Sequence, residues 1–193
     1  MAVDGVDGSG KSVFADQLAA LLSRSGRHII RASADDFHRS QAERYRRGRT
    51  SPLGFWLDSY DYDRLRSDLL DPLRSTRPAR YRLAVHDVAR DEPVNAPWHA
   101  RPPRAVLVLD GLFLHRQELR DYWDLSVYLD VPFEVTAARM ALRDGTHPDP
   151  DHSTMARYVE GQRLYLAECN PTALADIVID NADWDQPRLF DVP

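Results

Sequence analysis

The sequence is poor in cysteine, in long apolar runs and in excess positive charge, and each shortage excludes a class of protein. Its single cysteine, Cys169, cannot form an internal disulfide and suits a reducing compartment. No apolar run approaches membrane-spanning length and no segment resembles a signal peptide, so we expect a cytoplasmic protein that is not bound to a membrane. The formal net charge of -5 argues against bulk nucleic-acid binding.

The composition that remains is that of a folded domain. The chain has 193 residues, which is enough for one domain with a substantial core. Hydrophobic residues make up 43% of it and charged residues 28%, and this balance is unlike that of a disordered chain. We therefore predict one domain that spans residues 1–193.

The most informative stretch lies near the start, where residues 5–12 read Gly-Val-Asp-Gly-Ser-Gly-Lys-Ser. It fits the phosphate-loop pattern G-x-x-x-x-G-K-[ST] at every fixed position. Glycines free the backbone to turn its N–H groups toward a phosphate, and the positive end of the following helix adds to the attraction. Lys11 would reach the β- and γ-phosphates of ATP, and Ser12 would bind Mg²⁺. The predicted nucleotide-binding residues are Gly5, Asp7, Gly8, Ser9, Gly10, Lys11, Ser12 and Val13.

Strand-like and helix-like segments alternate along the rest of the chain. Strands are expected at residues 1–4, 28–33, 105–111, 125–131 and 176–180, and helices at 11–24, after 63, at 132–143 and at 153–168. This alternation predicts an α/β fold of the three-layer P-loop NTPase type, with a parallel five-stranded sheet and helices on both faces.

Three further segments are expected outside these elements. Residues 39–57 have the composition of a loop, residues 79–103 that of a small hairpin or flap, and the tail from Trp184 is expected to be peripheral. Within the single domain we assign residues 36–103 to an acceptor-binding insert and residues 143–153 to a lid. The acceptor-binding insert contains a local basic run from Arg39 to Arg49, which is either a solvated loop face or a flap that faces phosphate.

Two strands are expected to end in carboxylates with chemical roles. Asp110 closes the most apolar strand, where an acid can hold Mg²⁺ in the Walker-B manner, or else cap a turn. Asp35 and Asp36 follow the strand at 28–33, at the edge where open α/β sheets place ligands. Asp35 is the candidate to orient or deprotonate an acceptor hydroxyl, and the alternative is a pair of turn aspartates.

Two arginines complete the catalytic candidates. Arg139 and Arg143 are four residues apart and therefore share a helix face, from which they could clamp a phosphoryl group in transfer. The alternative for both is surface pairing with neighbouring acids. From the residues alone, the two interpretations of this arginine pair stay open.

From Val3 to about Asn181 the chain resembles the uridine kinase group of nucleoside kinases, which is related to phosphoribulokinase and pantothenate kinase. Residues 34–39, Ala-Asp-Asp-Phe-His-Arg, resemble the family's Asp-Ser-Phe-Tyr-Arg segment. The strand at 108–111 resembles one that ends in Glu-Gly, and residues 139–144 resemble the Arg-Arg-Val-Leu-Arg-Asp lid helix.

The resemblance implies roles on the acceptor side. It places Asp35 on the catalytic base, with Phe37 and His38 next to it in the acceptor pocket. Asp58 falls on the aspartate that binds the ribose hydroxyls, and Tyr81 and His86 match in spacing two residues that contact the base. A carboxylate suits a vicinal diol, and a tyrosine and a histidine suit a pyrimidine.

The chain also departs from the family in its lid. The loop at 145–151 is acidic and proline-rich and lacks the family's further basic residues. Arg157, or the run from Arg44 to Arg49, could supply the missing cations.

The resemblance implies an ATP- and Mg²⁺-dependent kinase that phosphorylates the 5′-hydroxyl of a nucleoside. Uridine and cytidine are the first candidates for that nucleoside. The alternatives are a kinase for another small alcohol of the pantothenate or sugar type, a thymidylate-kinase-like nucleotide kinase, and a nucleotide-binding regulatory module without an acceptor. Members of the family often form oligomers, so a homo-oligomer is a further expectation, although no exposed apolar stripe argues for it independently.

Overall fold

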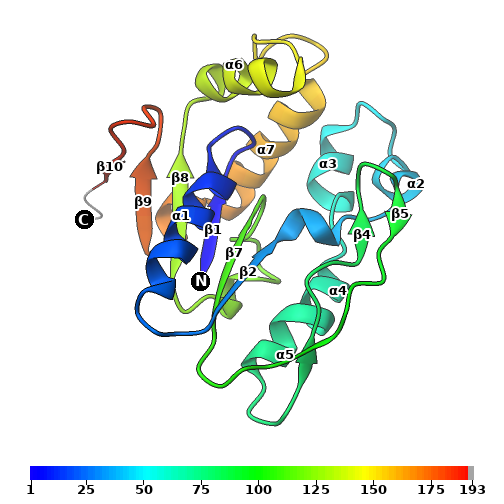
Figure 1. The fold of residues 1–193 in the computed structure, drawn as a ribbon. Coiled ribbons are helices and arrows are strands. Elements are labelled where there is room, and N and C mark those ends of the chain that lie inside the picture. Colours follow the sequence, from blue (N-terminus) through cyan, green and yellow to red (C-terminus); the bar gives the residue numbers. More distant parts are fainter. Residues whose placement is uncertain (191–193) are drawn as a thin grey trace.

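The computed structural model describes residues 1–190, which form a three-layer α/β fold around one central sheet (Figure 1). Five of its strands are parallel, and the short β10 pairs antiparallel with β9 at one edge. In spatial order the strands are β10 (Arg188–Leu189), β9 (Ile177–Asp180), β8 (Ser126–Asp130), β1 (Ala2–Gly5), β7 (Val106–Gly111) and β2 (Ile29–Ser33). The predicted parallel five-stranded sheet is confirmed, and the tail adds a sixth strand to it.

The two faces of the sheet have different partners. Val3 and Val108 point to the face that is covered by α1 (Lys11–Ser23), where they pack with Ala15 and Ala19. Ala2 and Leu109 point to the opposite core, which contains Trp56, Leu65 and Tyr165. Adjacent residues face opposite cores because side chains alternate along a strand.

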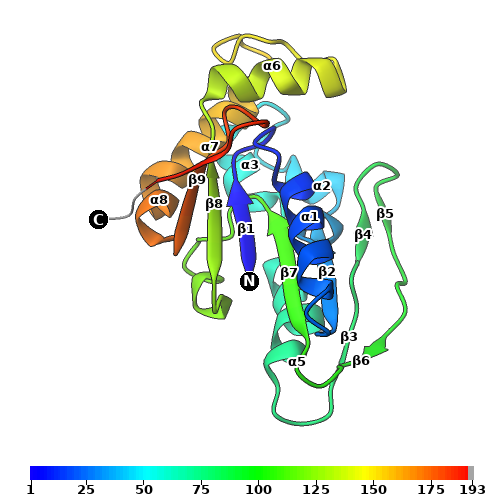
Figure 2. The same ribbon diagram turned by 60° about the vertical axis from the view of Figure 1, so that its left-hand side comes forward.

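Helices and short strands complete the second core and the rim. They are η1 (Ala34–Phe37), α2 (Gln41–Arg44), α3 (Pro52–Asp58), α4 (Tyr62–Leu65), η2 (Arg66–Leu70), α5 (Asp71–Arg74), β3 (Arg80–Tyr81), β4 (His86–Asp87), β5 (Glu92–Pro93), β6 (His99–Ala100), η3 (Arg120–Tyr122), α6 (Phe133–Asp144), α7 (Ala156–Cys169) and α8 (Pro171–Leu174). Figures 1 and 2 show α6 lying across the end of the sheet at which β1 and β8 terminate. None of the helices in the described part of the chain is both long and apolar enough to span a bilayer.

The expectation of a loop over residues 39–57 is wrong, because this segment contains α2 and α3. Ser40 caps α2 in a capping box with Glu43, and the side chain of Ser51 accepts a hydrogen bond from Gly54 N at the start of α3. Pro52 stands at the first turn of α3, where its missing N–H costs nothing. The capping residues Ser40 and Ser51 therefore start helices in a segment whose glycines and proline favour a loop.

The expectation of a flap over residues 79–103 is confirmed. β3 pairs with β6 and β4 pairs with β5, both antiparallel, and this excursion runs along one side of the molecule in Figure 2. Its tip contacts α2, where Gln41 N donates a hydrogen bond of 2.6 Å to Asp91 Oδ1.

Candidate active site

A cavity of about 740 Å³ opens at the carboxyl ends of the central strands, where open α/β sheets bind ligands. We call the half around the phosphate loop the donor half and the remainder the acceptor half. The donor half is lined by Asp7, Gly8, Gly10, Lys11, Ser12, Val13, Arg139, Leu142, Arg143, Asp144 and Trp184. The acceptor half is lined by Asp35, His38, Arg44, Tyr45, Phe55, Ser59, Tyr60, Val88, Leu112, Arg157 and Tyr158.

The phosphate loop has the backbone form that an anion site requires. Gly8 has a φ of +79°, and a Cβ on it would lie 2.7 Å from the carbonyl oxygen of Thr136 in α6, so no other residue fits there. No side chain caps the N-terminus of α1, which leaves its first N–H groups available to a phosphate. Lys11 Nζ donates to Val6 O at 3.0 Å within the loop.

Gly5 and Ser9, two of the predicted nucleotide-binding residues, lie behind the cavity rather than on its wall. Both are buried, and Ser9 O accepts a hydrogen bond of 2.7 Å from Asn181 Nδ2 after the last parallel strand. Gly5 N donates to Asp4 Oδ1 at 2.7 Å. These two residues therefore shape and anchor the loop, while the other six of the set line the cavity.

The loop is also fixed from α7, through residues that sequence analysis left without a role. Gln162 is 2% exposed, and its Oε1 accepts a hydrogen bond from Asp7 N. The Tyr165 hydroxyl donates to Asp4 Oδ2, and the same oxygen accepts from His115 Nδ1 at 2.7 Å. These bonds hold the end of β1, so the buried carboxylate of Asp4 does not lack partners.

Ser12 and Asp110 come together as predicted for a magnesium site. Ser12 Oγ donates to Asp110 Oδ2 at 2.6 Å. Asp110 Oδ1 is buried and accepts no hydrogen bond from residues 1–190, although Arg31 Nη1 lies 2.7 Å from it. The described residues contain no cluster of three or more acidic, histidine or cysteine ligands. One hydroxyl and one carboxylate nevertheless fit Mg²⁺, which takes its remaining ligands from water and phosphates.

Asp35 lies on the cavity wall and is held by Tyr60. The Tyr60 hydroxyl donates to Asp35 Oδ1 at 2.8 Å, and burial raises the pKa of Tyr60 well above its ordinary value, so the phenol stays a donor. The second carboxylate oxygen, Oδ2, has no protein hydrogen bond within the described residues. Asp35 therefore offers one oxygen to an acceptor in the cavity.

His38 stands next to Asp35, and its surroundings favour the neutral imidazole. Burial is the main cause that lowers its pKa. Its Nδ1 lies 2.7 Å from the carbonyl oxygen of Asp35, which can only accept, so Nδ1 carries the hydrogen and Nε2 is an acceptor. The His38 ring also packs at 4.4 Å against that of Tyr60.

Arg139 and Arg143 both reach the donor half, in different ways. Arg139 Nη2 donates to the carbonyl oxygens of Asn181 and Ala182 at 3.0 and 2.9 Å, and its guanidinium lies 4.4 Å from the ring of Trp184. Arg143 pairs with Asp144 at 2.6 Å and with Asp7 at 3.3 Å. Trp184, expected to be peripheral, is thus a wall residue of the donor half, which corrects that expectation.

The structure does not bring Phe37 or Asp58 into the cavity. Phe37, predicted to bind the acceptor, is fully buried in the core and does not line the cavity. The Asp58 carboxylate is also fully buried, and it accepts hydrogen bonds from Arg46 and, at 2.9 Å, from Arg47 Nε. Although burial opposes the shift, these arginines lower the pKa of Asp58. Both of its oxygens are bonded to these arginines, so the structure does not bring the predicted ribose contact to the cavity wall.

Tyr81 and His86, which were predicted to contact a base, are likewise absent from the cavity wall. Tyr81 is 6% exposed and packs beside His99, because β3 turns it toward the core. His86 is 8% exposed, and its Nε2 lies 3.1 Å from Asp91 Oδ1. The spacing of the two residues is preserved, but the flap holds both of them away from the cavity.

The acceptor half is formed instead by aromatic and basic residues of α2, α3 and α7. Phe55 and Tyr158 meet edge to face with ring centroids 5.1 Å apart. The two helices approach this closely because residue 161 is glycine, and a Cβ there would lie 2.8 Å from both Phe55 Cδ1 and Pro52 O. Sequence analysis singled out Arg44 and Arg157 as cations but missed Tyr45, Phe55 and Tyr158, for which no contiguous motif gives a signal.

Known proteins resemble this chain over most of its length. A uridine kinase from Deinococcus deserti is 28% identical over 197 residues, which cover 97% of this chain and 89% of that protein. One from Shewanella piezotolerans is 30% identical over 193 residues, 93% of this chain and 85% of that protein. The structure of a possible uridine kinase from Bacillus stearothermophilus shares the fold, with a TM-score of 0.68 at 23% identity over 92% of this chain and 85% of that one. The model of the phosphoribulokinase/uridine kinase family matches residues 1–161, and the chain therefore belongs to this family of P-loop kinases.

Proposed function

We propose that this chain transfers the γ-phosphoryl group of ATP to the 5′-hydroxyl of a nucleoside, with uridine and cytidine as the first acceptors to test. The observation that carries the proposal is that the phosphate loop and the Asp35 carboxylate line one cavity. The curated relatives that cover most of the chain are uridine kinases, which supports a nucleoside. The rings of Tyr45, Phe55 and Tyr158 provide faces against which a planar base could pack.

In this mechanism each residue has a separate task. The free oxygen of Asp35 accepts the proton of the attacking hydroxyl, while Tyr60 holds the other oxygen in place. Lys11 turns from Val6 O to the phosphates and offsets their negative charge. Arg143 adds positive charge on the lid side, and Arg139 keeps Gly8 and the segment after β9 together.

Ser12 and Asp110 are the residues that would hold Mg²⁺ with the nucleotide. When bound, the ion supplies positive charge at the phosphate oxygens. Closure of the lid at residues 143–153 would exclude water, which limits hydrolysis of ATP without an acceptor.

A kinase for another small alcohol is the second candidate. It is favoured by one observation, namely that Asp58, Tyr81 and His86 do not line the cavity. The contacts that would have identified a ribose and a pyrimidine are therefore replaced by others. A thymidylate-kinase-like activity and a regulatory nucleotide-binding module remain alternatives that a panel of acceptors separates.

The test is ADP release in the presence of ATP, Mg²⁺ and a panel of nucleosides, nucleotides and small alcohols. Lys11→Ala should abolish transfer, and Asp35→Asn should lower kcat by about 10²- to 10⁴-fold because the general base is lost. Asp36→Asn is the matched control, since Asp36 is adjacent in sequence and does not line the cavity.

Turnover of Lys11→Ala or of Asp35→Asn at the wild-type rate would contradict the proposed roles. ATP binding without turnover of any acceptor in the panel would favour the regulatory module.

A further inference from the structure

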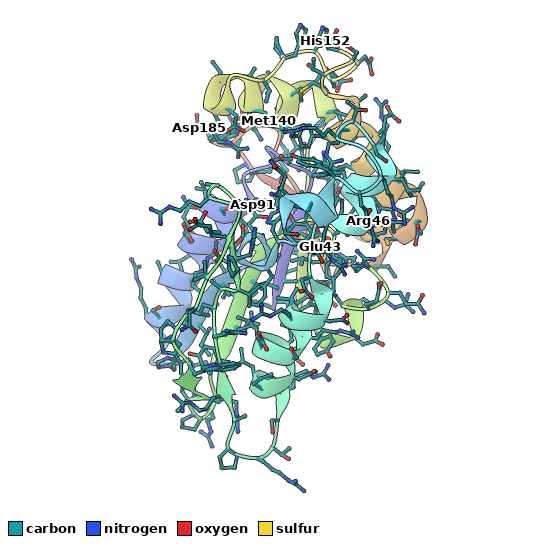
Figure 3. The ribbon with its side chains drawn as sticks, turned by 90° about the vertical axis from the view of Figure 1, so that its right-hand side faces the viewer. Glu43, Arg46, Asp91, Met140, His152 and Asp185 are labelled. Carbon is teal, nitrogen blue, oxygen red and sulfur yellow. The ribbon has the colours of Figure 1, made fainter. Side chains whose placement is uncertain are left out.

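The acceptor half contains two arginines whose charge no carboxylate fully balances. Arg44 comes from α2 and Arg157 from α7, and both line the cavity. The only carboxylate on the wall of this half is Asp35. Figure 3 looks onto this side of the molecule, where the labelled Glu43, Arg46 and Asp91 lie around α2.

Arg157 is buried among neutral groups. It is 6% exposed, and its guanidinium donates to the carbonyl oxygens of Ser51, Arg44 and Gly48 at 3.0, 3.2 and 3.4 Å. It also lies 4.8 Å from the Tyr45 ring. Within residues 1–190 it forms no salt bridge, and burial lowers its pKa, as expected for a cation without a counter-ion.

Arg44 is only weakly paired. Its Nη2 lies 3.4 Å from Asp91 Oδ1, an oxygen that also accepts from Gln41 N and lies 3.1 Å from His86 Nε2. Its Nε is buried and has no hydrogen-bond partner among the residues that the structure describes. A buried guanidinium N–H without a partner costs free energy that a bound anion would recover.

The neighbouring charges do not cancel this excess. Asp58 is committed to Arg46 and Arg47, and on the donor side Asp144 and Asp7 are committed to Arg143. Asp35 already accepts from Tyr60 and is the proposed base. The acceptor half therefore carries excess positive charge at Arg44 and Arg157, in addition to the Asp35 carboxylate that takes the proton.

We propose that the natural acceptor carries an acidic group, a carboxylate or a phosphate, in addition to the hydroxyl that is phosphorylated. Arg44 and Arg157 bind this group, while Tyr45, Phe55 and Tyr158 contact the less polar part of the molecule. The inference rests on the proposed phosphotransferase function and narrows its acceptor. A neutral nucleoside leaves both arginines without an anion, whereas an acidic acceptor of the same shape supplies one.

The experiment compares neutral and acidic acceptors of the same framework. The pairs are uridine with orotidine and pantothenol with pantothenate for the carboxylate, and ribose with ribose 5-phosphate for the phosphate. The kcat/KM for ADP release is measured for each. For at least one pair, the kcat/KM of the acidic acceptor should exceed that of the neutral acceptor by about 10- to 100-fold. This is the range that hydrogen bonds to a charged group supply. The pair that shows the preference identifies which anion binds.

Arg44→Gln should remove most of that preference, through a higher KM for the acidic acceptor. Arg90→Gln removes the same charge from the flap, from a side chain that is 77% exposed and outside the cavity wall, and should keep the preference. A preference that falls equally in both variants would overturn direct binding by Arg44.

The inference is overturned if each neutral acceptor that is turned over is as good as its acidic partner. That result leaves the proposed function intact. Failure of every acceptor, neutral and acidic, would instead count against the proposed phosphotransferase activity itself.

Discussion

Tyr60 is the residue on which the geometry of Asp35 depends. Its ring is 1% exposed and packs against His38 and Phe113, so the hydroxyl has little freedom to leave Asp35 Oδ1. A hydrogen bond to a charged group contributes more than one between neutral groups. Tyr60 is thus a positioning residue, and its neighbour Tyr62, whose hydroxyl does not contact Asp35, offers a matched comparison.

Tyr60→Phe should lower kcat by about 10-fold, because Asp35 loses the bond that orients it. ATP affinity and the thermal midpoint should change little, since the ring and its packing remain. Steady-state kinetics with nucleotide titration and calorimetry measure these quantities, and Tyr62→Phe should leave kcat at the wild-type value. An unchanged kcat in Tyr60→Phe would show that Asp35 does not need the phenol.

Residues within contiguous motifs could be predicted from the sequence, and residues assembled from separate segments could not. The phosphate loop and Asp35 follow directly from strand ends and spacing, and Lys11, Ser12 and Asp35 do line the cavity. Asp58 was placed by a local likeness, but two arginines twelve and eleven residues earlier close on its carboxylate. No pattern in one segment reveals a partner that arrives from another.

At the scale of elements, the close approach of α3 and α7 determines the acceptor half. Gly161 sits against Phe55 and Pro52 at distances that a side chain would not tolerate. The sequence indicated a helix over this region, but a glycine inside a helix gives no hint of which neighbour comes close. The helix could therefore be predicted, and its packing partner could not.

Gly161→Val should destabilise the fold by about 1–3 kcal/mol, because the new side chain forces α3 and α7 apart. The KM for the acceptor should rise more than the dissociation constant of ATP, since Phe55 and Tyr158 line only the acceptor half. Urea denaturation measures the change in stability, and steady-state kinetics measure the KM. Leu164→Val is the control, because Leu164 lies on the same helix and is 40% exposed. Wild-type stability and KM in Gly161→Val would contradict it.

At the scale of the whole molecule, donor and acceptor sites share one sheet edge, because all five parallel strands end there. The order of the strands and the two cores follow from alternating apolar residues and right-handed crossovers, which is why the fold class was predictable. The pairing of β10 with β9 and the place of Trp184 on the cavity wall could not be predicted, because two paired residues and one exposed indole leave no periodic pattern.

Binding of ATP should stabilise the whole domain. At a hundred times its dissociation constant a ligand contributes about 2.7 kcal/mol, which for a chain of this size raises the midpoint by roughly 5–11 °C. AMP lacks the β- and γ-phosphates that Lys11 would contact and should give a much smaller rise at the same concentration. Differential scanning fluorimetry with Mg²⁺ measures both, and an AMP shift as large as that of ATP would contradict binding through the phosphate loop.

The position of the Lys11 ammonium inside the cavity has a practical consequence. Twenty-five residues of the chain are lysine or arginine, yet Lys11 is the only lysine. An amine-directed acylating reagent therefore finds a single ε-amino target in the protein, and that target lies where the phosphates are expected. The extent of its covalent modification, read by mass spectrometry, becomes a direct gauge of whether the nucleotide site is filled, with no need for a substituted side chain.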